Sequence, residues 1–190
     1  MSRYELLLFL HISAAIIWLG AGFLLAVLIF GAERAGDAEK EAGHHRDVAW
    51  LAPRLFIPAS LSVFVFGLLL VLDSPAWNFD QLWITLALAG WGASFLLGIL
   101  YFKPEGERIA ALAEERGPRD PELNSRLHRV NVVDRVQLTI LFLVVVDMVI
   151  KPTGEDNGTL IVGAAILAAA IVFAATSINR HRAAAEPPAP

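Results

Sequence analysis

The chain has 190 residues, of which 56% are hydrophobic and 18% are charged, and its formal net charge is −4. This composition is too apolar for an ordinary soluble domain, and the absence of cysteine excludes disulfides, thiolate metal sites and covalent c-type haem attachment. Basic residues do not cluster with aromatic residues along the chain, which argues against nucleic acid as a partner.

Five apolar runs suit crossings of a hydrocarbon core of about 30 Å, which requires about 20 helical residues. They cover residues 6–30, 55–72, 82–102, 136–150 and 160–178, and the fourth has an amphipathic lead-in from residue 130. We therefore predict an all-α, polytopic membrane bundle whose first four spans form a core in residues 1–152. An extra span in residues 153–179 and a flexible tail in residues 180–190 are expected to follow. The lipid bilayer is the first expected partner.

Lysine and arginine collect in the connections at residues 31–50 and 103–129 and in the tail, whereas only Arg3 and Lys151 lie at the opposite ends of the spans. Because basic residues accumulate in cytoplasmic loops, both connections are predicted to be cytoplasmic and the N-terminus to lie outside. The chain is then expected to cross a bacterial cytoplasmic membrane five times.

The first span contains "LHISAAIIWLGAG", and helical rise puts His11 on the order of 10 Å below the outer surface. At about 100° per residue, His11 shares a stripe that we expect to face the bundle interior, with Tyr4, Trp18, Gly22, Leu25 and Ile29. One interpretation of His11 is structural, as a neutral imidazole bonded to a neighbouring helix. The functional alternatives are an axial ligand to haem iron, a copper ligand and a proton carrier.

The second span has two notable features at its inner edge. Pro58 lacks an amide hydrogen and crowds the carbonyl of Arg54, so a bend is expected there. Arg54 and Asp134 of the fourth span both lie about one turn inside the cytoplasmic boundary, where an unpaired charge is costly, and we predict a structural ion pair between them. The alternative is that Arg54 reaches the headgroups alone and that Asp134 caps the fourth helix.

The connections and the third span carry further signals. The segment "DSPAWNFDQLW" contains Trp77 and Trp83, which suit the outer interface. In the third span, Gly90, Ser94 and Gly98 recur every fourth residue and form a narrow face on which a neighbouring helix can pack closely. The inner connection contains "PEGERIAALAEERG", which predicts a short docked helix ending at its last glycine, and a solvated connector is the alternative.

The fourth span runs outward and brings Met148 to within about 5 Å of the depth of His11. Ligation of haem b by His11 and Met148, in a slot that includes Gly22, is therefore one hypothesis, although a lone methionine near a helix end also suits simple packing. Asp147 is expected either to accept the second N–H of His11, as the usual support of a ligating histidine, or to face the outer water. The chain offers few of the soft sulfur ligands that copper(I) prefers, because it has no cysteine and only two methionines.

The stretch "LHISAAIIWLGAG" resembles the first-helix signature of the small bacterial membrane families around the copper-resistance D proteins and the HemJ-type protoporphyrinogen oxidases. In HemJ-type proteins the first-helix histidine ligates haem b, which implies that role for His11, with Trp18, Gly20 and Gly22 lining or shaping the pocket. The segments "RDVAWLAPRLFIPASLSVFVFG" and "VVVDMVIKP" resemble an uncharacterised bacterial integral-membrane family, and the resemblance covers roughly residues 1–152. Spans two and three lack the lysine of the HemJ-type pattern, so the resemblance does not extend to porphyrinogen oxidation.

Two main functional hypotheses follow from the sequence. The first is an integral membrane protein that binds haem b through His11 and has a redox or electron-transfer role. The second is a non-catalytic accessory or assembly subunit of a larger membrane complex, or a homo-oligomer, in which small-residue faces bind partner helices and His11 fastens the bundle. A copper or proton pathway is the third hypothesis.

Overall fold

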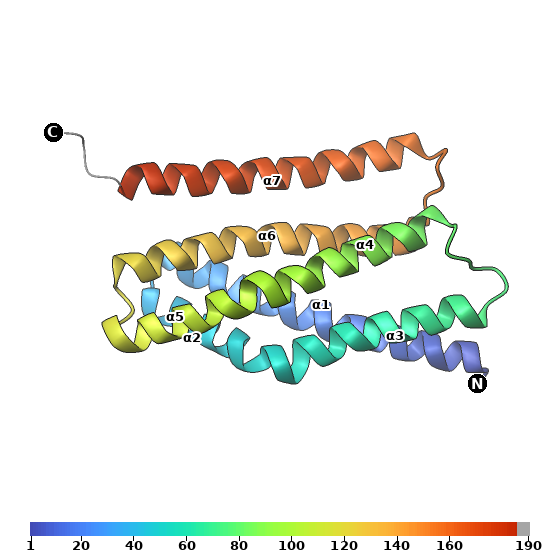
Figure 1. The fold of residues 1–190 in the computed structure, drawn as a ribbon, viewed down its shortest axis with the longest axis horizontal. Helices are drawn as coiled ribbons and strands as arrows, with labels where there is room; N and C mark the ends of the chain where they lie inside the picture. The colour runs from blue at the N-terminus through green and yellow to red at the C-terminus, as the bar shows by residue number, and fades with distance from the viewer. Residues whose placement is uncertain (186–190) are drawn as a thin grey trace.

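The computed structural model describes residues 1–185, which form a bundle of long antiparallel helices (Figure 1). In chain order the elements are α1 (Arg3–Ala35), α2 (Ala38–Leu51), the π-helical segment η1 (Ala52–Phe56), α3 (Ile57–Asp73), α4 (Leu82–Leu97), the π-helical segment η2 (Gly98–Phe102), α5 (Lys103–Arg116), α6 (Pro121–Ile150) and α7 (Asn157–Ala185). No strand occurs in residues 1–185. The predicted all-α class is confirmed.

The long helices lie along one axis of the molecule. Figure 1 shows α1, α3, α4, α6 and α7 running along the length of the bundle, with the shorter α2 and α5 gathered at the end opposite the N-terminus. Helix α1 packs along α3, α4 packs along α6, and α7 lies on the outside against α6. Helix α7 is therefore an addition to a core made by the first six helices.

Four helical stretches within the described residues are long and apolar enough to cross a membrane: Arg3–Ala35, Ala38–Asp73, Leu82–Arg116 and Asn157–His181. Helix α6 is not among them, and it carries Asp134 and Arg135 near its middle and Asp147 in its apolar second half. It nevertheless runs beside α4 and α7 along the bundle (Figure 1). The chain is thus a multi-pass membrane protein, while the crossing by α6 and the outside position of the N-terminus stay predictions.

The two connections predicted to be cytoplasmic loops are mostly helical. Residues 31–50 contain the end of α1 and most of α2. Gly36 lies between these helices and adopts a φ of 67°, a left-handed conformation that residues with a side chain rarely adopt. Residues 103–129 contain α5 and the start of α6. Helix α5 docks on α6 because Ile109 is buried against Leu123 and Leu127. Arg126 of α6 also pairs with Glu105 of α5 at 3.0 Å.

The bend expected in the second span takes the form of segment η1. Here the N–H of Ile57 bonds to the carbonyl of Ala52, five residues earlier, which is one residue more than in an α-helix. Pro53 and Pro58 flank this turn and cannot donate amide hydrogen bonds of their own. The wider turn absorbs the disruption without breaking the helix.

The C-terminal tail was predicted to be flexible from residue 180. Residues 180–185 instead continue helix α7, and residues 186–190 lie outside the described residues. At the end of the bundle that holds the N-terminus, the Nζ of Lys151 lies over the rings of Trp77 and Trp83, at 4.1 Å and 5.2 Å from their centroids. This contact joins the connection between α3 and α4 to the end of α6.

Candidate functional site

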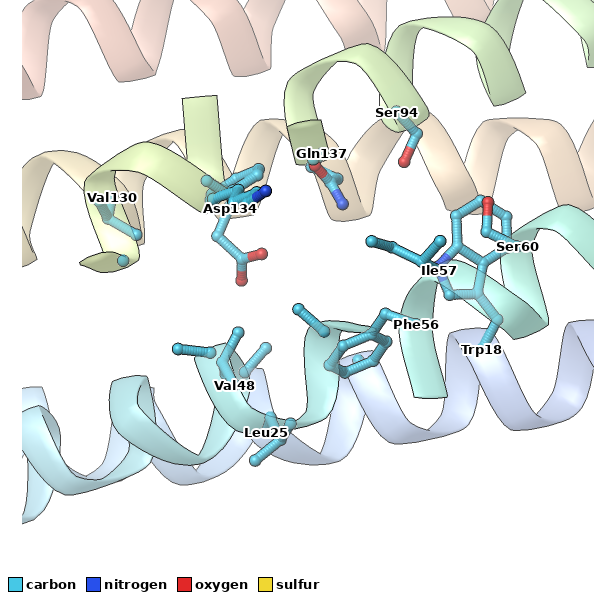
Figure 2. Close-up of a pocket in the computed structure, with 18 of the residues that line it drawn as sticks. Trp18, Leu25, Val48, Phe56, Ile57, Ser60, Ser94, Val130, Asp134 and Gln137 are labelled. Atoms are coloured by element: carbon cyan, nitrogen blue, oxygen red, sulfur yellow. The ribbon is translucent and has the colours of Figure 1, made fainter. Parts of the chain in front are cut away.

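A cavity of about 340 Å³ lies inside the bundle (Figure 2). Its wall is built from α1, the α2–η1–α3 stretch, the α4–η2–α5 stretch and α6. Most of the wall is apolar, and its aromatic side chains include Trp18, Phe56, Phe95 and Phe102. The cavity therefore suits a molecule with a substantial apolar part.

Polar and charged side chains interrupt this apolar wall, namely His45, Ser60, Ser94, Lys103, Glu107, Asn131, Asp134 and Gln137. Figure 2 shows the carboxylate of Asp134, on α6, pointing into the open centre of the cavity, with Gln137 and Ser94 nearby. Among the described residues, the hydroxyl of Ser94 and the Oε1 atom of Gln137 are buried and have no hydrogen-bond partner. Asp134 likewise has no hydrogen bond or ion pair within residues 1–185. Unpartnered polar atoms in an apolar cavity are costly and mark places where a bound molecule can supply the missing partner.

Both π-helical segments border the cavity. Segment η1 contributes Pro53 and Phe56, and segment η2 contributes Gly98, Ile99 and Phe102. A π turn accommodates an extra residue and widens the helix locally, and such turns often occur at functional sites. The two segments occupy matching positions: η1 joins α3 to the shorter α2, and η2 joins α4 to the shorter α5.

A hydrogen-bonded chain of three side chains reaches the end of the cavity beside α2. The Nδ2 of Asn131 donates to Glu41 at 2.7 Å, and the Nε2 of His45 donates to the Oδ1 of Asn131 at 2.8 Å. Both His45 and Asn131 are buried and line the cavity. His45 belongs to the polar helix α2, outside the predicted apolar span of residues 55–72.

The predicted ion pair between Arg54 and Asp134 is not formed. Arg54 instead donates to the carbonyl of Trp50 at 2.9 Å and lies over the indole of the same residue, at 4.5 Å from its centroid. Arg135, which follows Asp134, pairs with Glu33 on α1. Arg54 faces outward at the surface because a guanidinium near a membrane edge can reach polar surroundings and stack on tryptophan. Asp134 is thereby left facing the cavity.

His11 lies outside the cavity and is fastened to α3. Its Nδ1 donates to the carbonyl of Val63 at 2.9 Å. Gly67 provides the space for the ring, because a Cβ atom at that position would lie 3.2 Å from the Cε1 of His11. The residues predicted to surround a haem are thus divided: Trp18 and Gly22 line the cavity, whereas His11 and Met148 do not.

Asp147 does not support His11. It is buried, and both of its carboxylate oxygens lack a partner among the described residues. No group of three or more histidine, cysteine, aspartate or glutamate side chains that could hold a metal ion is found in the described part of the chain. The predicted ligand set for haem or copper is therefore not assembled in this geometry.

Sequence reasoning missed His45, Asn131 and Gln137 as members of one site. His45 was assigned to a cytoplasmic loop, whereas α2 folds back over the end of the cavity. A signal was present on α6, where polar residues 131, 134 and 137 recur every third residue before the fully apolar part of the helix. This spacing puts three polar groups along one side of a helix.

Comparison with known proteins identifies the family. A family model described as "Predicted integral membrane protein (DUF2269)" matches residues 5–152, and the chain belongs to this family. Searches of curated proteins and of solved structures found no match. The family match supports the prediction of a membrane protein, and it carries no link to the copper-resistance D or HemJ-type proteins.

Proposed function

We propose that this member of the DUF2269 family binds a lipophilic small molecule with a cationic or hydrogen-bond-donating head in the central cavity. The observation that carries the proposal is the unpaired carboxylate of Asp134, which points into a mainly apolar space (Figure 2). An ionisable side chain at such a position in a membrane protein is a functional candidate by default, because leaving it without a partner is costly.

The chemistry of the wall favours a donor over an acceptor. Asp134 and the Oε1 of Gln137 can accept hydrogen bonds. Lys103, which also lines the cavity, forms no ion pair with Asp134 within residues 1–185. An ammonium group can therefore form a charge-assisted hydrogen bond with the carboxylate, whereas an anionic head meets a like charge. The aromatic walls suit the apolar body of such a molecule.

The test compares three probes that share one butylphenyl body: butylbenzylamine, butylbenzyl alcohol and butylbenzoate. Binding is measured on the purified chain in lipid nanodiscs. We expect the amine to bind most tightly, the alcohol less tightly and the benzoate least, and we expect Asp134→Asn to weaken binding of the amine by roughly tenfold, the value of a charge-assisted hydrogen bond.

Asp147→Asn is the matched control, because Asp147 is an aspartate of the same helix that does not line the cavity. Its affinity for the amine is expected to equal that of the unmodified chain. The proposal would be contradicted if the three probes bound with equal affinity. It would also be contradicted if Asp134→Asn and Asp147→Asn lost affinity for the amine to the same extent.

Haem b binding through His11 is a second candidate, and one contact favours it. Donation from Nδ1 to the carbonyl of Val63 leaves the lone pair of Nε2 free, which is the usual arrangement of a ligating histidine. The visible spectrum of the purified protein tests it directly. A Soret band that disappears in His11→Ala supports this candidate, and a colourless protein from haem-replete cells rules it out.

A further inference from the structure

We propose that the cavity recognises a head group with two hydrogen-bond donors, one for the carboxylate of Asp134 and one for the Nδ1 of His45. A lipophilic amino alcohol is the chemical class that fits, with its ammonium on Asp134 and its hydroxyl on His45. This inference rests on the proposed function and adds a second recognition contact to it.

The role of His45 follows from the chain of hydrogen bonds behind it. An ionised carboxylate can only accept, so Glu41 holds the amide NH₂ of Asn131 toward itself at 2.7 Å. The carbonyl oxygen of Asn131 then faces His45, and the 2.8 Å contact requires a hydrogen on Nε2. In the neutral ring Nδ1 is left as an acceptor, and it has no partner among the described residues.

The two acceptors lie on the same part of the wall. Asn131 and Asp134 are three residues apart on α6, so they share one side of the helix and differ in height by about 4.5 Å. His45 is hydrogen-bonded to Asn131, and His45 and Asp134 both line the cavity. A head with a single donor can satisfy one of these acceptors, whereas an amino alcohol can satisfy both.

The binding test pairs butylphenethylamine with the amino alcohol that differs from it by one hydroxyl on the benzylic carbon, next to the amine-bearing carbon. In the unmodified chain we expect the amino alcohol to bind roughly five- to tenfold more tightly, the usual value of one added hydrogen bond in a partly dry site. In His45→Phe we expect the two probes to bind equally. His44→Phe is the control, because His44 does not line the cavity, and it is expected to keep the preference.

A second measurement does not depend on a folded variant. Nitrogen NMR of isotope-labelled histidine in the unmodified chain reads which ring nitrogen of His45 carries the hydrogen, and we expect it on Nε2. Glu41 is a positioning residue, so Glu41→Gln, which no longer enforces the orientation of Asn131, is expected to yield a mixture of the two tautomers.

The outcomes separate this inference from the proposed function. A hydrogen on Nδ1 of His45 in the unmodified chain, or no preference for the amino alcohol, overturns the two-donor inference even if Asp134→Asn still weakens binding of the amine. Loss of the Asp134 effect overturns the proposed function. Retention of the preference in His45→Phe overturns the role of His45 alone.

Discussion

At the scale of single residues, the clearest difference from the sequence-based predictions concerns His11 and Asp134, the one expected about 10 Å below the outer surface and the other about one turn inside the cytoplasmic boundary. His11 is satisfied by the backbone of α3, through its bond to the carbonyl of Val63, and its ring fits the space left by Gly67. Asp134 has no partner among the described residues and faces the cavity. Of these two groups, Asp134 is therefore the one available to a ligand in the cavity.

His11→Ala is expected to lower the free energy of unfolding by about 1 kcal/mol, because it removes one interhelical hydrogen bond within the membrane. The measurement is unfolding of the purified protein by SDS titration. His11→Asn, which keeps a donor near the carbonyl of Val63, is expected to recover part of the loss. An unchanged stability of His11→Ala would contradict the fastening role.

The direction of His11 could be predicted from helical periodicity, and the inward stripe of α1 includes Trp18 and Gly22 of the cavity wall. The hydrogen-bond partner of His11 could not be predicted, because it is the backbone carbonyl of Val63 and every residue has such a carbonyl. The Arg54–Asp134 prediction failed for a related reason. Similar depth does not fix the direction of a side chain, and Arg54 has Trp50 one turn away on its own helix.

At the scale of secondary-structure elements, the close packing of α4 against α6 forms one side of the bundle. Gly90 lies so close to α6 that an added Cβ would overlap the side chain of Val144. Two turns along α4 from Gly90, Gly98 begins segment η2 and lines the cavity, and Ser94 between them is buried. The predicted small-residue face therefore serves both close packing and the cavity wall.

Gly90→Ala is expected to destabilise the fold by about 1–3 kcal/mol, because the added methyl forces α4 away from α6. Gly92→Ala is the control: nothing lies within 4 Å of its added Cβ, and the change favours the helix. The double variant Gly90→Ala with Val144→Ala is expected to recover part of the stability. Equal effects of Gly90→Ala and Gly92→Ala on thermal unfolding would argue against the close contact.

The helices themselves were largely predictable, because long apolar runs and capping residues mark them. The docked helix α5 was also predictable, since Ile109 and Leu112 share one face and both join the cluster at the start of α6. Segments η1 and η2 were not. Proline at 53 and 58 signals a disturbance in the second span, but η2 contains no proline, and a π turn depends on the packing of neighbouring helices.

At the scale of the whole molecule, the long helices of the bundle include α6, which carries Asn131, Asp134 and Gln137 of the cavity wall. A helix that crosses a membrane can hold such residues when they face the interior of the bundle. Helix α6 differs from the four strongly apolar stretches because it carries charged residues near its middle and in its apolar second half. These include Asp134, which faces the cavity, and Arg135, which pairs with Glu33. A crossing by α6 is consistent with this placement.

Single cysteines test this topology, because the chain has none of its own. With a membrane-impermeant maleimide on intact spheroplasts, Ala76→Cys and Gly154→Cys are expected to react from outside, and Arg119→Cys only after permeabilisation. Reaction of Gly154→Cys only after permeabilisation would show that α6 does not cross the membrane.

The central claim is that the cavity lined by Asp134 is a binding site, and photolabelling tests it most directly. Butylbenzylamine carrying a diazirine is cross-linked to the protein in nanodiscs, and the labelled peptides are mapped by mass spectrometry. Binding in the cavity predicts labels on wall residues such as Phe56, Leu138 and Leu141, reduced by excess unlabelled amine and by Asp134→Asn. Labels spread over exposed residues of α7, such as Ile161 and Phe173, without competition by unlabelled amine, would contradict it.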